Sequence, residues 1–304
     1  MLKHFILLCA SFLYIITSEA STFEIKELDS GVYVHNGLHE DISEDYHGDI
    51  CNLSFIVGNK GIAVIDTGGS YHTGARFLEA IRQVSTLPIL YVINTHVHPD
   101  HIFGNKAFTK ENPIFVGHYL LPDSMELRKE SYLRSNKEWL GDDFNGSEIV
   151  KPGLTVKTTL ELDLGDRTLT LTAYPTAHSN TDLTVVDSKT NTLFTGDLLF
   201  VDRTPSIDGD IKGWISVIDE MSNGTFKQVV PGHGPTQTNY QQAIKNEKNY
   251  LTTLLKDIRA SIKKGETMES TMDTAAESEK GKWLLFEIVN RRNVNNIYHS
   301  LEWE

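Results

Sequence analysis

Four potential metal ligands stand within six residues of this 304-residue chain, in the segment His96-Val97-His98-Pro99-Asp100-His101. The apolar stretch at residues 89–94 directly precedes them and predicts a buried strand. The end of a rigid strand can aim several imidazoles at one point, and we expect a loop there because Pro99 resists a helical continuation. Imidazole and carboxylate ligands suit zinc. The chain must therefore fold so that a strand ends at a metal centre.

Three later residues extend this ligand set, because each one ends a predicted strand or begins a turn. They are His178, Asp197 in Thr195-Gly196-Asp197, and His233 in Pro231-Gly232-His233-Gly234. A catalytic zinc keeps one position open for water while protein ligands fill the others. Seven ligands suffice for two such ions, so the sequence predicts a two-metal site.

The rest of the chain alternates between strand and helix patterns. Strands are predicted at residues 31–34, 53–57, 61–66, 89–94, 154–162, 168–173, 181–186, 192–194 and 228–230, those from 154 to 194 forming a second sheet. Helices are predicted at residues 71–84, 123–140, 211–221, 240–264 and 282–301. The polar stretch at 265–281 is bounded by glycines and is the best candidate for a linker. This order predicts an α/β fold with mixed sheets flanked by helices.

The ordered set of motifs resembles the metallo-β-lactamase superfamily over about residues 30–240. The residues that carry the resemblance are Asp66-Thr67-Gly68, His96-x-His98-x-Asp100-His101, His178, Gly196-Asp197 and Gly232-His233-Gly234. It implies an αββα sandwich of two mixed β-sheets flanked by helices. It assigns His96, His98 and His178 to a first metal, and Asp100, His101 and His233 to a second. Asp197 would bridge both metals, and Asp66 would hydrogen-bond near the ligand loop; capping a turn is the alternative for Asp66.

A narrower resemblance lies outside the ligands, in residues 48–52 (Gly-Asp-Ile-Cys-Asn), 208–214 (Asp-Gly-Asp-Ile-Lys-Gly-Trp) and 293–303. These segments are similar to the quinoprotein relay system zinc metallohydrolases. The resemblance implies an exported protein associated with periplasmic quinoprotein dehydrogenases, and it leaves the reaction open.

The first twenty residues have the pattern of a cleavable signal peptide, with Lys3 before an apolar run and small residues at Ser18 and Ala20. The apolar run falls well short of the roughly 20 residues of a spanning helix, so we expect a periplasmic or secreted protein without stable membrane insertion. We divide the chain into a signal peptide (1–20), a catalytic domain (21–264) and a helical extension packed on the same domain (265–304). A net charge of −13 disfavours a nucleic-acid partner.

The expected reaction is hydrolysis of a small-molecule lactam, lactone, ester or thioester by a metal-bound hydroxide, with two zinc ions per chain. Asp100 and Asp197 would hold the hydroxide and are the candidate catalytic residues. Two alternatives stay open. One is an enzyme with a single iron that oxidises a sulfur substrate, and the other is a non-hydrolytic metal-binding accessory protein for a quinoprotein system.

Several further residues have both a functional and a structural interpretation. Arg203 could receive a substrate carboxylate through paired donors or form a surface salt bridge. Asp182 could orient a ligand or make a local turn bond, and His118 and His47 could line the entrance or lie on solvated loops. Cys51 is either a reactive thiol or a buried inert one. The apolar residues at 283–289 suit a helix that docks a partner or one that packs on its own domain.

Overall fold

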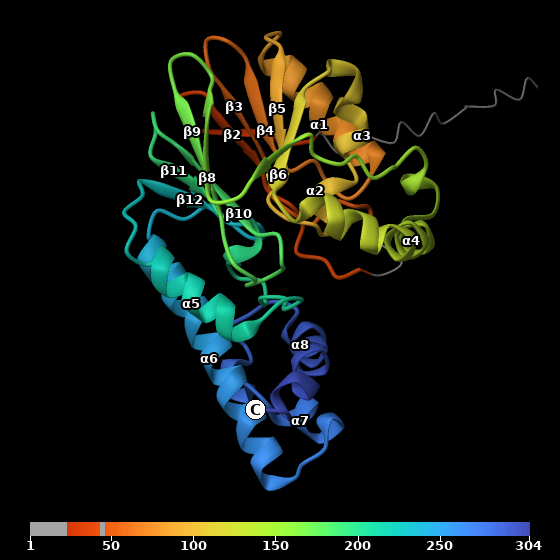
Figure 1. Ribbon diagram of the computed structural model, residues 1–304, viewed down its shortest axis with the longest axis vertical. Helices are drawn as coiled ribbons and strands as arrows, with labels where there is room; N and C mark the ends of the chain where they lie inside the picture. Colours follow the sequence, from red (N-terminus) through yellow and green to blue (C-terminus); the bar gives the residue numbers. More distant parts are fainter. Residues whose placement is uncertain (1–22, 43–45) are drawn as a thin grey trace, which may run out of the picture.

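Two mixed β-sheets pack face to face between layers of helices in the computed structural model, which describes residues 23–42 and 46–304 (Figure 1). The predicted αββα sandwich is confirmed. The predicted signal peptide lies outside the described residues. Among the helices of the described residues, none is both long enough and apolar enough to cross a membrane.

The first sheet has seven strands in sequence order, antiparallel from β1 to β4 and parallel from β4 to β7. Its strands are β1 (Lys26–Asp29), β2 (Val32–His35), β3 (Leu53–Val57), β4 (Ile62–Ile65), β5 (Ile89–Ile93), β6 (Ile114–His118) and β7 (Leu154–Val156). Strands β3 and β4, predicted at residues 53–57 and 61–66, form an antiparallel hairpin.

The second sheet has five strands in the order β12-β11-β10-β9-β8, with only the β11–β12 pair parallel. Its strands are β8 (Thr159–Asp163), β9 (Thr168–Ala173), β10 (Leu183–Asp187), β11 (Thr192–Phe194) and β12 (Gln228–Val230). The single strand predicted at residues 154–162 is therefore wrong. Its two halves, β7 and β8, pair in different sheets, and a periodic pattern does not reveal a change of partner.

Alternation along the strands builds the layers, because successive side chains point to opposite faces of a sheet. In β4, Ala63 and Ile65 belong to the apolar cluster between the two sheets, whereas Ile62 and Val64 belong to the outer cluster under α1 (Tyr71–Val84). Both faces of this strand are buried, which explains its continuous apolar run.

Helices cover the outer face of each sheet (Figure 1). The first sheet is covered by α1 and α3 (Asn105–Phe108), with α4 (Leu121–Leu140) at its end. The second sheet is covered by α5 (Ile211–Met221) and α6 (Tyr240–Lys264). The lower end of α6 packs with α7 (Met268–Thr274) and α8 (Phe286–Leu301).

Two other local predictions differ from the structure. Helix α2 (Pro99–Ile102) begins at Pro99 where a loop was predicted, because a proline in the first helical turn loses no hydrogen bond. The stretch predicted as a linker contains α7, and its residues Thr271, Ala275 and Ala276 are buried. Residues 265–281 are thus part of the packed helical region.

Candidate metal centre

The seven predicted ligands meet at one edge of the sandwich, where parallel strands of both sheets end. His96 and His98 follow β5, and Asp100 and His101 lie in α2. His178 stands between β9 and β10, Asp197 follows β11, and His233 follows β12. The carboxyl ends of neighbouring parallel strands lie at the same edge, so β5, β11 and β12 can deliver side chains from distant parts of the sequence to one place.

Three imidazoles and one carboxylate form a first group. His98 Nδ1 lies 3.0 Å from His96 Nε2 and 2.9 Å from His178 Nε2. Asp197 Oδ2 lies 3.4 Å from His178 Nε2 and 3.7 Å from His96 Nε2. Two nitrogens bound to one tetrahedral zinc stand about 3.3 Å apart. The separations in this group are close to that spacing.

Asp197 also belongs to a second group, with Asp100, His101 and His233. His101 Nε2 lies 3.2 Å from Asp197 Oδ1 and 3.5 Å from Asp100 Oδ2. His233 Nε2 lies 3.3 Å from Asp197 Oδ2 and 3.4 Å from Asp100 Oδ2. The Asp197 carboxylate thus faces both groups, and Gly232 leaves room for it: a Cβ on Gly232 would lie 1.9 Å from Asp197 Oδ1.

The outer ring nitrogen of every one of these five histidines contacts an oxygen. A proton on that outer nitrogen leaves a lone pair on the inner nitrogen, which is the form that binds a metal. The pairs are His96 Nδ1 with Thr95 Oγ1 (3.0 Å), His98 Nε2 with Asp208 Oδ2 (3.1 Å), His101 Nδ1 with Asp66 Oδ2 (2.8 Å), His178 Nδ1 with the Ser206 carbonyl (2.7 Å) and His233 Nδ1 with the Ile50 carbonyl (2.7 Å).

Two buried atoms at the centre of the site test whether a metal fits. His101 Nε2 and Asp197 Oδ1 lie 3.2 Å apart, but neither atom makes a hydrogen bond with the other or with any other described residue. Leaving buried polar atoms unsatisfied is costly, and a bound cation would satisfy both. Burial and the neighbouring His98 lower the pKa of His178 to about 4, so its imidazole is neutral at pH 7. The donor set therefore fits divalent metals.

Asp66 joins the end of β4 to this centre. Its carboxylate accepts hydrogen bonds from the Thr95 backbone N–H (2.9 Å) and the Thr95 hydroxyl (2.8 Å), besides its contact with His101. Asp66 adopts a left-handed backbone conformation, with φ of 57°. This conformation turns the chain at the strand end, and the carboxylate lies against the ligand loop as the superfamily resemblance implies.

A cavity of about 290 Å³ opens beside the metal-binding groups. Three arginines line it together with apolar side chains that include Ile42, Tyr132, Trp139 and Val289. The arginines are Arg128, which pairs with Asp208, Arg292, which pairs with Asp41 through two hydrogen bonds, and Arg203. The cavity thus combines an apolar wall with cationic groups.

The surface salt bridge considered for Arg203 is wrong, because this residue is 7% exposed. Its guanidinium donates from Nη1 to the Glu40 carbonyl at 2.7 Å. No carboxylate among the described residues lies within ion-pair distance of Arg203. Burial lowers its pKa, against the opposing influence of Asp100 and Asp197. Of the three arginines, Arg203 is the one whose charge is not directly paired within the described parts of the chain.

The other sequence candidates have structural contacts. Asp182 accepts hydrogen bonds from the Ser179 N–H (2.8 Å) and hydroxyl (2.7 Å), the local turn bond considered above. His118 is buried and contacts the Tyr174 carbonyl, and His47 pairs with Asp143 on the surface. Neither histidine lines the cavity beside the metal-binding groups.

Cys51 and part of the late apolar segment are also buried. The Cys51 thiol donates to the Asp100 carbonyl at 2.8 Å, and burial raises its pKa well above the usual value, which favours the inert interpretation. Trp283, Phe286 and Val289 are buried, the first two in the cluster beneath the second sheet, as expected for a helix packed on its own domain. Leu284 and Ile288 stay exposed.

Four of the five residues whose oxygens contact the outer nitrogens were not predicted as site residues. Thr95 directly precedes the predicted ligand His96, but no motif singles it out. Ser206 and Ile50 contribute backbone carbonyls, which no side-chain pattern can reveal. Asp208 had a signal, since it begins one of the segments behind the narrower resemblance, but its contact with His98 depends on the tertiary fold.

Comparison with known proteins agrees with this geometry. A family model described as the metallo-beta-lactamase superfamily matches residues 47–250. A linear primary-alkylsulfatase from Pseudomonas sp. is 40% identical over 58 residues, which are 19% of this chain and 11% of that protein. The match thus spans a small part of the relative's length.

Two solved structures illustrate the similarity in fold. A metallo-beta-lactamase from Pontibacter korlensis aligns with a TM-score of 0.60 and 21% identity, covering 75% of this chain and 98% of its own. The sec-alkylsulfatase Pisa1 from Pseudomonas sp. aligns with a TM-score of 0.70 and 14% identity, covering 91% of this chain and half of its own. At these identities the likeness concerns the fold.

Proposed function

Since the chain belongs to the metallo-β-lactamase superfamily, we propose that it is a hydrolase that binds two zinc ions and opens a lactam, lactone, ester or thioester. The observation that carries the proposal is the convergence of five histidine nitrogens and two carboxylates, with every outer histidine nitrogen in contact with an oxygen. Such an outer shell selects the ligating tautomer of each ring.

His96, His98 and His178 would hold the first ion, Asp100, His101 and His233 the second, and Asp197 both. When bound, two divalent ions would supply a water of lowered pKa and a Lewis acid for the carbonyl. Asp100 lines the cavity, so its carboxylate would orient the attacking water and accept its proton. Asp197, buried between the two groups, would keep them at a fixed separation.

Arg203 would select the substrate. A guanidinium without a direct ion pair, in a cavity with an apolar wall, favours a substrate that joins an apolar body to a negatively charged group. The planar fork of N–H donors suits a carboxylate or a sulfate.

Alkyl sulfate hydrolysis is the second candidate reaction. The 58-residue match to an alkylsulfatase supports it, and so do the apolar and cationic side chains of the cavity. In that case the sulfate group that Arg203 binds would also contain the bond that is hydrolysed.

Export to the periplasm and a link to a quinoprotein dehydrogenase system belong to the same proposal. The three segments behind the narrower resemblance meet near the metal-binding groups: the Ile50 carbonyl bonds His233, Asp208 bonds His98, and Asn293 bonds Ile207. A stable complex with such a dehydrogenase and no turnover would favour the accessory role. One bound iron with oxygen consumption would favour the sulfur-oxidising alternative.

Metal analysis and a matched set of substrates test the proposal. We expect about two zinc ions per chain, loss of one of them with loss of hydrolysis in Asp100→Ala, and turnover of mono-p-nitrophenyl adipate above that of p-nitrophenyl hexanoate. The two esters differ by one terminal carboxylate. Turnover of octyl sulfate instead of both esters would favour the second candidate. An active protein without any transition metal would contradict both.

The role of Arg203 has its own matched control. Arg203→Gln is expected to raise KM for the adipate ester about ten- to hundredfold, the value of a charge-assisted hydrogen bond, and to leave the neutral ester unchanged. Arg292→Gln removes the same charge from the same cavity, but that guanidinium is already paired with Asp41. Equal effects of the two substitutions, or equal effects on both esters, would contradict the assignment.

A further inference from the structure

Residues 204–208 form an irregular segment that bonds two of the three histidines in the first metal-binding group. The Ser206 carbonyl accepts from His178 Nδ1 at 2.7 Å, and the Asp208 carboxylate accepts from His98 Nε2 at 3.1 Å. Residues 204–207 belong to no helix or strand. Contacts that fix residues 204–208 therefore also fix the positions of His98 and His178.

Two asparagines of α8 bond the backbone on either side of Ser206. Asn293 accepts from the Ile207 N–H at 2.9 Å through Oδ1, and it donates to the Pro205 carbonyl at 2.7 Å through Nδ2. Asn296 donates to the Ile207 carbonyl at 2.9 Å. Buried backbone groups must find partners, and here side chains of a helix supply them where a sheet normally would.

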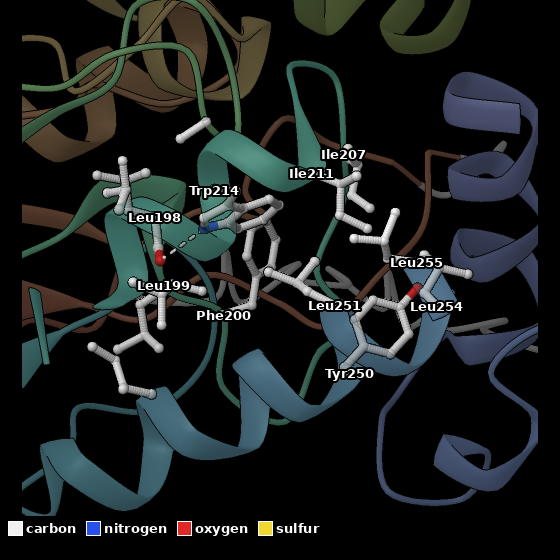
Figure 2. Close-up of a cluster of buried hydrophobic side chains, with 14 of the residues drawn as sticks. Leu198, Leu199, Phe200, Ile207, Ile211, Trp214, Tyr250, Leu251, Leu254 and Leu255 are labelled. Carbon is white, nitrogen blue, oxygen red and sulfur yellow. Dashed lines mark hydrogen bonds between the residues drawn. The ribbon is translucent and has the colours of Figure 1, made fainter. Parts of the chain in front are cut away.

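The same region fixes the start of the segment. The Leu284 carbonyl, just before α8, accepts from the Thr204 N–H at 3.0 Å and from the Thr204 hydroxyl at 2.8 Å. The Ile207 side chain is fully buried and is labelled in the apolar cluster of Figure 2, which also holds Leu251 and Leu254 of α6. Polar and apolar contacts thus hold residues 204–207 against the C-terminal helices.

Asn293 is itself fixed. Its side chain is fully buried, and Nδ2 also bonds the hydroxyl of Tyr250 on α6 at 2.8 Å. Each polar atom of the amide therefore has a partner, and the amide has one orientation that satisfies all of them. A small shift of α8 would move the Ser206 carbonyl that faces His178.

We propose that Asn293 and Asn296 are positioning residues of the first metal-binding group. Through them, helix α8 helps to orient the ligands of the metal centre. Both asparagines act through residues 205–207, which set the direction of the Ser206 carbonyl and the place of Asp208. The inference rests on the proposed function in one respect, namely that the first group binds a metal.

The test measures how firmly the zinc-loaded full chain retains its metal. Zinc is extracted with increasing amounts of a chromogenic chelator, and cadmium-113 NMR, with one resonance per site, identifies the site that changes. Asn293→Ala is expected to weaken the first site about tenfold, the lower end of the range for residues that orient metal ligands, and to leave the second site unchanged. Asn296 is exposed, so Asn296→Ala is expected to weaken zinc binding at the first site by a smaller factor.

Asn290→Ala is the matched control. Asn290 is buried on the same helix and also makes two hydrogen bonds, from the Tyr250 hydroxyl (3.0 Å) and to the Ala275 carbonyl (2.9 Å), and neither bond reaches residues 204–208. Asn293 makes three hydrogen bonds and Asn290 two, so Asn290→Ala is expected to lower the melting temperature by a comparable or somewhat smaller amount, without changing the first site.

The outcomes separate the two ideas. Wild-type protein that holds no metal at the first group contradicts the proposed function itself. Wild-type protein that holds it, with equal retention in the Asn293 and Asn290 variants, overturns the inference alone. If Asn293→Ala does not fold, the Asn296 variant decides, and unchanged retention there overturns the inference.

Discussion

Different parts of the chain hold the two halves of the metal centre. The second group is held by the first sheet and the segment between its strands β2 and β3: Asp66 at the end of β4 bonds His101, and the Ile50 carbonyl, shortly before β3, bonds His233. In the first group, His98 and His178 depend on the irregular segment 204–208. One half thus relies on a strand end, and the other half on a segment held by the last helix of the chain.

The distinction is not complete, because Thr95 connects the halves. Its hydroxyl donates to Asp66 and contacts His96 Nδ1 at 3.0 Å. His96 is therefore held from the first sheet, although it belongs to the first group. This connection predicts that a substitution of Asp66 disturbs more metal ligands than a substitution of Asp208 does.

Asp66→Asn should have the largest effect. The Thr95 backbone N–H requires an oxygen at the Oδ1 position, so the amide nitrogen would take the Oδ2 position and face His101 Nδ1. It would donate to that ring nitrogen, move the ring proton to Nε2 and abolish the ligating lone pair. We expect metal affinity of the second group to fall about a hundredfold, the upper end for outer-shell substitutions. Zinc retention against a chelator, with cadmium-113 NMR to separate the sites, measures it. Loss confined to the first site would contradict the assignment of Asp66.

The second metal-binding group, which Asp66 holds, could be predicted from the sequence more completely than the first group. Strand ends and ligand spacing are local features, and the Asp66 motif stands next to a predicted strand, so the fold layers and the seven converging side chains could be anticipated. The contacts of Ser206 and Ile50 involve backbone carbonyls, which have no signature in side-chain identity. Likewise, the division of residues 154–162 between two sheets depends on distant partners.

Asp208→Asn should have an intermediate effect on the first group. An asparagine can turn its carbonyl oxygen toward His98 Nε2, so the ligating tautomer survives, and a third of the Asp208 side chain is open to solvent. We expect metal affinity to fall about tenfold at the first site. Arg128→Gln is the control, because it removes the ion pair with Asp208 and keeps the bond to His98. Equal loss in both variants would show that the ion pair, and not the bond to His98, matters.

Asp182→Asn should have the smallest effect, on the turn that carries His178. Burial raises the pKa of Asp182 to about 7, against the opposing hydrogen bonds from Ser179. A carboxyl group whose pKa is higher in the folded protein binds its proton more tightly there, so it stabilises the fold at low pH. That stabilisation is lost as the pH rises from about 4 toward 7.

An amide at this position keeps both bonds with Ser179 and does not titrate. The unfolding free energy of the wild type should therefore fall relative to that of the Asp182→Asn variant, by at most about 1.4 kcal/mol per pH unit. Urea unfolding at saturating zinc, at pH 5, 6 and 7, measures the difference between the two proteins, which have every other titratable group in common. Parallel stability curves would mean that Asp182 is ionised throughout this range, and the turn at His178 would then carry a buried negative charge beside the first group.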